Sequence, residues 1–102
     1  MSSPSATVEL HASGVRFFSA GDESAFFGWL KSLSCVKHIE GRGRTIYISV
    51  DVSTIDDDGL RELLALFQRY EVDMAQLIAF DRDEFAGWFR RRNSYWHRAV
   101  FG

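Results

Sequence analysis

The chain has 102 residues, of which 46% are hydrophobic and 25% are charged, and its formal net charge at neutral pH is −2. This length predicts one domain spanning residues 1–102, and the composition is that of a globular protein, which excludes disordered and fibrous classes. A single cysteine excludes an internal disulfide, and no apolar run approaches the roughly 18 residues that a membrane-spanning helix requires.

The N-terminal stretch MSSPSATVELHASG has neither the basic region nor the apolar region of a secretory signal peptide. We therefore expect a cytoplasmic protein without membrane attachment. Residues 1–5 are small and polar, and we expect them to be disordered.

Two pairs of apolar, β-branched segments predict strands. Residues 7–12 alternate apolar and polar side chains, and residues 15–19 (VRFFS) follow a Ser-Gly pair, which predicts a first hairpin. Residues 35–53 predict a second hairpin with its turn in EGRGR. We therefore expect about four strands in two hairpins.

Helical periodicity appears in two long segments. The first begins at Asp22, which we expect to be the N-cap, and its apolar face consists of Phe26, Phe27, Leu30 and Leu33. The second spans 54–73 and is capped by Thr54 or one of the following aspartates. Its apolar stripe consists of Leu60, Leu63, Leu64 and Phe67.

The rest of the chain predicts shorter helices. Residues 73–80 fit a short helix capped by Asp73 or, alternatively, a strand, and we favour the helix. A last helical region starts near Asp83 and breaks at Asn93-Ser94. The whole pattern predicts an α+β fold, in which a small antiparallel sheet carries three to four helices on one face.

Charge is distributed unevenly along the chain. Residues 51–84 have a net charge of −7, whereas residues 85–102 have a net charge of +4 and contain no acid. Solvated helix faces account for most such blocks, but an acidic surface that meets a basic partner is the functional alternative.

The C-terminal segment DEFAGWFRRRNSYWHRAVFG combines rings with arginines. In a helix, Phe85, Trp88 and Phe89 share one face, so we expect Trp88, Phe89 and Trp96 to be mainly structural. Exposed arginines beside rings could instead hold nucleic acid, but the isoelectric point near 5.9 disfavours that function. The same acidic balance disfavours a membrane surface.

The histidine, cysteine and acidic residues form no recognisable catalytic or metal-binding motif. The three histidines are far apart in the sequence, and Asp56, Asp57 and Asp58 lack the spacing of a calcium loop. Cys35 and His38 form a Cys-x-x-His pair, but positions three apart on a strand point to opposite faces. We expect no catalytic residue, no metal, no cofactor and no enzymatic activity.

Three stretches of the sequence resemble a known class of proteins. Residues 22–30, 60–77 and 88–102, ending WFRRRNSYWHRAVFG, are similar in pattern to small uncharacterised bacterial α+β proteins. Small acidic proteins of this kind resemble the immunity proteins of bacterial toxin systems. The resemblance implies a protein partner and transfers no functional residue.

The leading interpretation is a non-enzymatic protein-binding module of the immunity type, which would occlude the basic cleft of a toxin. We expect its acidic contacts to be Asp56, Asp57, Asp58 and Glu62. Two alternatives use the C-terminal tail: a dimerisation domain, or a nucleic-acid-binding regulator. The residues of that tail surface are Arg90, Arg91, Arg92, Tyr95 and Arg98.

Overall fold

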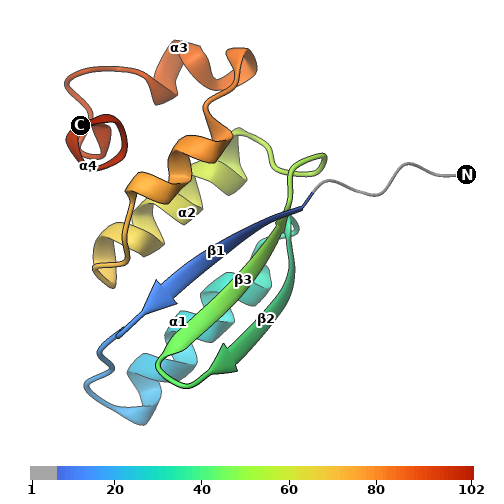
Figure 1. Ribbon diagram of the computed structural model, residues 1–102, viewed down its shortest axis with the longest axis vertical. Helices are drawn as coiled ribbons and strands as arrows, with labels where there is room; N and C mark the ends of the chain where they lie inside the picture. Colours follow the sequence, from blue (N-terminus) through green and yellow to red (C-terminus); the bar gives the residue numbers. More distant parts are fainter. Residues whose placement is uncertain (1–6) are drawn as a thin grey trace, which may run out of the picture.

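The computed structural model describes residues 7–102, and the expectation for residues 1–5 lies outside them (Figure 1). The order of elements confirms an α+β fold. The elements are the strands β1 (Thr7–Ser13), β2 (Val36–Arg42) and β3 (Thr45–Asp51), the α-helices α1 (Ala20–Ser32), α2 (Asp57–Arg69), α3 (Ala86–Phe89) and α4 (His97–Phe101), and the 3-10 helices η1 (Ala75–Phe80) and η2 (Asp83–Phe85).

The described residues form one antiparallel sheet of three strands in the order β1-β3-β2. The prediction of about four strands was wrong at residues 15–19, which form no strand. β1 instead pairs with β3 along its whole length, from Thr7 opposite Asp51 to Ser13 opposite Thr45. The second predicted hairpin is confirmed as β2 and β3, and Gly43 turns it with a φ of 60°.

Residues 15–18 alternate in burial for a reason other than sheet pairing, since Val15 and Phe17 are half-buried whereas Arg16 and Phe18 are exposed. Gly14 takes a φ of 66°, and its N–H donates to the carbonyl of Arg44 at 2.9 Å, so the chain leaves the sheet there. Beyond this point Phe17 packs edge-on against Phe26, with ring centroids 5.3 Å apart, and also contacts Tyr70. The apolar positions of this segment therefore anchor a connection to the helices.

Helix α1 begins before the expected cap. Ser19 is the N-cap, because its Oγ accepts a hydrogen bond from the N–H of Asp22 at 3.1 Å. Asp22 in turn accepts from the N–H of Phe18 at 3.0 Å, so the two side chains satisfy one donor of the first turn and one donor of the residue that precedes the cap. Asp22 is thus a first-turn residue, and its predicted role as the cap was wrong. Phe26, Leu30 and Leu33 are buried as expected.

Helix α2 carries the longest apolar stripe. Asp56, one of the candidate caps, accepts from the N–H of Gly59 at 2.8 Å and begins the helix. The stripe is fully buried against the inner face of the sheet and the C-terminal segment. Its members are Leu60, Leu63, Leu64 and Phe67, together with Leu66.

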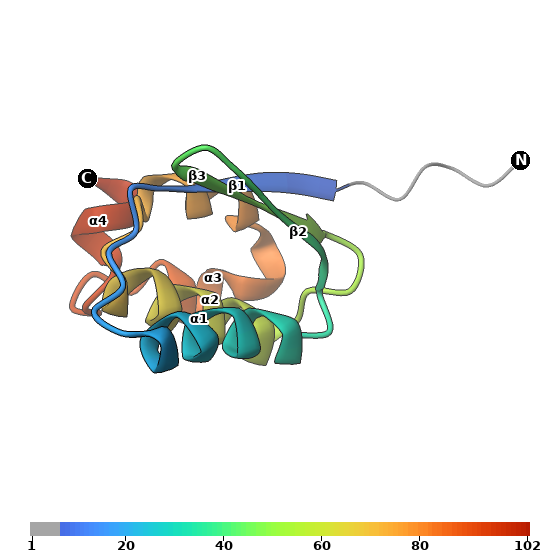
Figure 2. The same ribbon diagram turned by 90° about the horizontal axis from the view of Figure 1, so that it is seen from below.

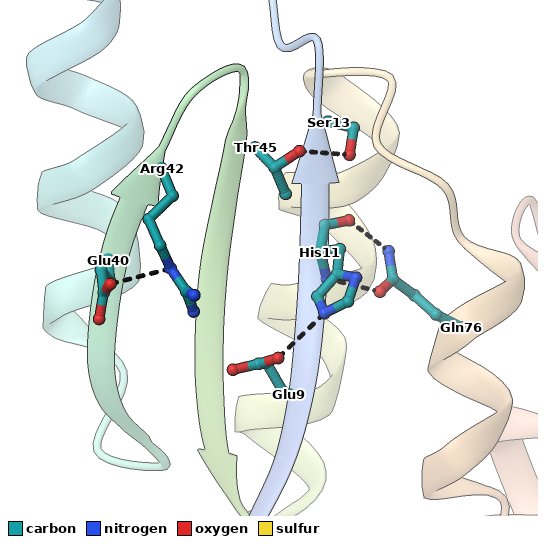
Figure 3. A network of polar contacts seen from close by, with 7 residues as sticks. All are labelled: Glu9, His11, Ser13, Glu40, Arg42, Thr45 and Gln76. Atoms are coloured by element: carbon teal, nitrogen blue, oxygen red, sulfur yellow. Dashed lines mark hydrogen bonds and ion pairs between the residues drawn. The ribbon is translucent and has the colours of Figure 1, made fainter.

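The elements form two layers (Figure 2). α1 and α2 lie beneath one face of the sheet, while η1 continues the sheet layer beyond β1. The helical prediction for 73–80 is confirmed at Ala75–Phe80, but the N-cap is Met74 rather than the predicted Asp73, and η1 flanks the edge of the sheet rather than its face. Gln76 makes this contact, because its side-chain amide accepts from the N–H of His11 and donates to its carbonyl, both at 2.8 Å (Figure 3). The amide occupies part of an edge that would otherwise be unpaired.

The C-terminal rings are mainly part of the core, as the spacing predicts. Phe85, Phe89 and Trp96 are buried, and the indole N–H of Trp96 donates to the carbonyl of Phe89 at 2.7 Å. The chain breaks between α3 and α4 around Asn93-Ser94. No helix within residues 7–102 is long and apolar enough to cross a membrane.

The turn from β3 into α2 is organised by Asp51, which is only 8% exposed. Its Oδ1 accepts from the Oγ of Ser53 at 2.7 Å and from the N–H of Ser53 at 2.9 Å. Its carbonyl accepts from the N–H groups of Thr54 and Ile55, each at 3.2 Å. The hydrogen bonds from Ser53 lower the pKa of Asp51 below its ordinary value, because they favour the carboxylate.

We predict that Asp51 contributes to the acid sensitivity of folding. Its pKa is lower in the folded chain than in the unfolded chain, so its contribution is complete above the unfolded value of about 3.9. That contribution disappears as the pH falls through the lower folded-state pKa. In urea denaturation at neutral pH, Asp51→Ala should be less stable than wild type, and the comparison should be repeated at successively lower pH. The two proteins should converge in acid, and a constant difference would contradict this role.

Two helical glycines provide a matched test of packing. An added Cβ at Gly28 in α1 meets nothing within 4 Å, so Gly28→Ala should raise the free energy of unfolding by about 0.5–1 kcal/mol. At Gly59 in α2 the same atom would lie 3.2 Å from Oδ1 of Asp56 and 3.3 Å from Sγ of Cys35. Gly59→Ala should therefore gain less or lose stability in urea denaturation. Equal gains would show that the contacts at Gly59 relax freely.

Candidate functional site

The four acids expected to contact a partner lie together at the N-terminal end of α2, but most have internal roles. Asp56 caps the helix. Asp57 accepts from the indole N–H of Trp88 at 3.0 Å, and Glu62 accepts from the indole N–H of Trp29 at 2.8 Å. Asp58 is exposed and has no side-chain hydrogen bond or ion pair within residues 7–102. The acidic end of α2 therefore both holds rings and carries negative charge at the surface.

The rings bound by these acids flank α2 on both sides. Trp29 comes from α1, and Trp88 comes from α3. Arg61 of α2 also lies against Trp88, with its guanidinium carbon 4.1 Å from the ring centroid. The outer side of α2 thus binds both neighbours through polar contacts, while its inner side binds them through apolar packing.

A shallow groove of about 480 Å³ follows the outer side of α2. It is lined by Trp29 and Tyr95, which flank the helix, and by Ala65, Gln68 and Arg69 of the helix itself. Tyr95 is 55% exposed and lies close enough to Glu62 for its charge to act on the phenol. Partial burial, and secondly the charge of Glu62, raise the pKa of Tyr95 above its ordinary value, so the phenol remains a hydrogen-bond donor at neutral pH. We call this set of residues the α2 groove.

The structure separates the members of the predicted tail surface. Arg90 pairs with Asp81 at 2.6 Å, which raises the pKa of the guanidinium through the hydrogen bond and the charge of Asp81. Arg91, Arg92 and Arg98 are exposed and have no ion pair within residues 7–102. Tyr95 belongs to the α2 groove. The tail therefore contributes one ring, Tyr95, to the groove, and its other arginines are exposed to solvent.

Sequence reasoning overlooked Trp29 as a surface residue. The predicted face of the first helix contained its phenylalanines and leucines, and Trp29 lies outside that face. The position of Trp29 outside that apolar face was the only indication in the sequence that this ring could lie near the surface. Only the tertiary structure shows that its indole reaches Glu62 across the two helices.

The outer face of the sheet is a second polar surface, and no described element covers it (Figures 2 and 3). Its charges are paired locally: Glu40 contacts Arg42 at 2.9 Å, and Glu9 contacts His11 at 3.1 Å. Arg42 also lies over the ring of Tyr47, with its guanidinium carbon 4.2 Å from the centroid. Because these groups satisfy one another, this face presents less unpaired charge than the acidic end of α2.

The structure does not bring Cys35 and His38 together. Cys35 is buried beneath the sheet, whereas His38 is exposed beside Glu40. Burial raises the pKa of the Cys35 thiol, so it remains protonated and poorly nucleophilic at neutral pH. Among residues 7–102, no group of three or more histidine, cysteine, aspartate or glutamate side chains is arranged to hold a metal ion.

No family model, curated protein or solved structure matches this chain. The site is therefore defined by its own residues and geometry.

The two exposed aspartates of the first turn of α2 should differ in their effect on stability. Asp57→Ala and Asp58→Ala remove the same favourable interaction with the helix dipole, but only Asp57→Ala also removes the hydrogen bond to Trp88. Asp57→Ala should cost about 0.5–1 kcal/mol more in chemical denaturation. The difference should vanish in a Trp88→Phe background. Equal losses in the wild-type background would mean that the Asp57–Trp88 contact adds no stability.

Proposed function

We propose that this protein is a non-enzymatic protein-binding module that meets a basic partner with the outer side of α2. One observation carries the proposal: Trp29 and Tyr95, which are far apart in the sequence, line one groove beside Glu62. Large rings beside a charged group are the residues that dominate binding energy in protein interfaces.

The charges around the groove favour a basic partner. Asp57, Asp58 and Glu62 give the N-terminal end of α2 a negative field, while Arg61 is stacked on Trp88 and Arg69 lies at the opposite end of the helix. A cationic side chain of the partner would approach Asp58 and Glu62 and lie near the rings. Arg69 would then favour an acid at the other end and so define the orientation of the complex.

The geometry supports binding by occlusion. Glu62 holds the indole of Trp29 in place, so little of this side chain's entropy is lost on association. The sequence resemblance proposes a more specific partner, a toxin with a basic cleft that this surface would cover. The second candidate is self-association through the half-exposed ring of Tyr95.

Reversal of charge in α2 should abolish partner binding. Asp58→Lys changes an acid with no partner within residues 7–102, so it should leave the fold intact while it slows association and blunts its salt dependence. The matched control is Glu23→Lys, which places the same charge in the first turn of α1. The measurement is capture from an extract of the native cells at two salt concentrations, followed by surface plasmon resonance with the identified partner.

Three outcomes separate the candidates. A stoichiometric protein partner that binds wild type and Glu23→Lys but not Asp58→Lys supports the proposal. Unchanged binding of that partner to Asp58→Lys refutes the role of α2. A dimer by light scattering that dissociates in Tyr95→Ala, without a second protein, supports self-association instead.

A further inference from the structure

A second cleft, of about 620 Å³, lies where the connection from β1 to α1 passes the C-terminal end of α2. Arg16 and Phe18 line it from the connection, and Asp22 lines it from the first turn of α1. Arg69, Tyr70 and Glu71 line it from the end of α2. Its volume falls in the range of small-molecule sites, about 300–1,000 Å³. The binding surface proposed above does not require this cleft, although Arg69 borders both.

The two arginines of the cleft have their charge available. Neither Arg16 nor Arg69 takes part in an ion pair within residues 7–102, whereas Arg42, Arg82 and Arg90 all do. The Asp22 carboxylate of the cleft is already engaged. It accepts from the N–H of Phe18 at 3.0 Å, and it lies close enough to Tyr70 that burial, and secondly this carboxylate, raise the pKa of the phenol. Two unpaired guanidinium groups beside an occupied carboxylate are suited to a bound anion.

Phe18 provides an exposed ring beside these charges. Residues 15–18 alternate, so Val15 and Phe17 pack on the core while Arg16 and Phe18 face outward. As a result Phe18 is 84% exposed, although a phenylalanine gains stability from burial. A ring that stands beside arginines can stack on a planar group of an anionic ligand.

Glu71 adds a third kind of contact. It follows α2 with a φ of 57°, a left-handed conformation that glycine usually supplies at the end of a helix. A glutamate here places a carboxylate on the cleft, where it can accept hydrogen bonds from sugar hydroxyls, as acidic residues do in nucleotide sites on other folds. The adjoining cleft, of about 510 Å³, shares Gly14 and Arg16 and adds Arg44, which provides room and charge for further phosphate groups.

We propose that this cleft binds a nucleotide, with the base stacked on Phe18, the phosphates on Arg16 and Arg69, and the ribose hydroxyls at Glu71. The shared chemistry, a phosphate next to a planar base, occurs both in free nucleotides and at single-stranded nucleic acid. None of the C-terminal arginines lines this cleft. The proposed nucleotide site is therefore separate from the nucleic-acid surface that the C-terminal sequence suggested.

The test is isothermal titration calorimetry of the full chain with ADP, adenosine, pyrophosphate and a short single-stranded oligoadenylate. ADP should bind saturably, and adenosine and pyrophosphate should each bind about tenfold more weakly or worse. Arg16→Gln and Phe18→Ala should each weaken ADP binding by about tenfold. The matched controls Arg98→Gln and Ile78→Ala change an exposed arginine and an exposed apolar residue outside the cleft, and they should have no effect.

The outcomes decide both the site and the source of the ligand. If Arg16→Gln and Phe18→Ala weaken binding, the relative affinities identify the ligand. Tighter binding of ADP than of the oligoadenylate indicates a free nucleotide, and the reverse order indicates single-stranded nucleic acid. Absence of saturable ADP binding at millimolar concentration overturns the proposal. Pyrophosphate that binds as tightly as ADP, or ADP binding that is unchanged in Phe18→Ala, also overturns it. Partner capture through Asp58 is independent of all these outcomes, because Asp58 does not line the cleft.

Discussion

Burial of the apolar stripe of α2 is the constraint on which the rest of the structure depends. Leu60, Leu63, Leu64 and Phe67 are all fully buried, and full burial of such side chains stabilises a fold by about 1.5–3 kcal/mol each. The sheet with α1 covers part of this stripe, and the C-terminal rings cover the rest. The chain therefore needs both its strands and its aromatic end to close one core.

The outer side of the same helix links its neighbours through polar contacts. Asp57 holds Trp88 and Glu62 holds Trp29, so the acids that give α2 its surface charge also position rings from α3 and α1. Stability and surface charge are coupled there, because a change at either acid alters the packing as well as the electrostatic field. Asp58 is the acid that separates the two effects, since it contributes charge without a contact of this kind within residues 7–102.

Both proposed sites lie along α2, and Arg69 borders each of them. The acidic end meets rings that the protein itself orients, which suits a basic protein surface. The C-terminal end meets the connection from β1, where Arg16 and Phe18 face outward beside Arg69. The charges along α2 complement the helix dipole, because Asp57 and Asp58 lie in its first turn and Arg69 lies in its last.

The sequence by itself determined the α+β class, the hairpin of β2 and β3, and the helices α1 and α2, because these depend on local periodicity and turn chemistry. It also indicated correctly that the C-terminal rings are core. Only the tertiary structure decided that β1 pairs with β3 rather than with residues 15–19, since the alternation of Val15 and Phe17 suits a strand and a packed connection equally. It likewise decided which acids hold rings and which remain free, because those contacts join residues about thirty positions apart, beyond the reach of any local pattern.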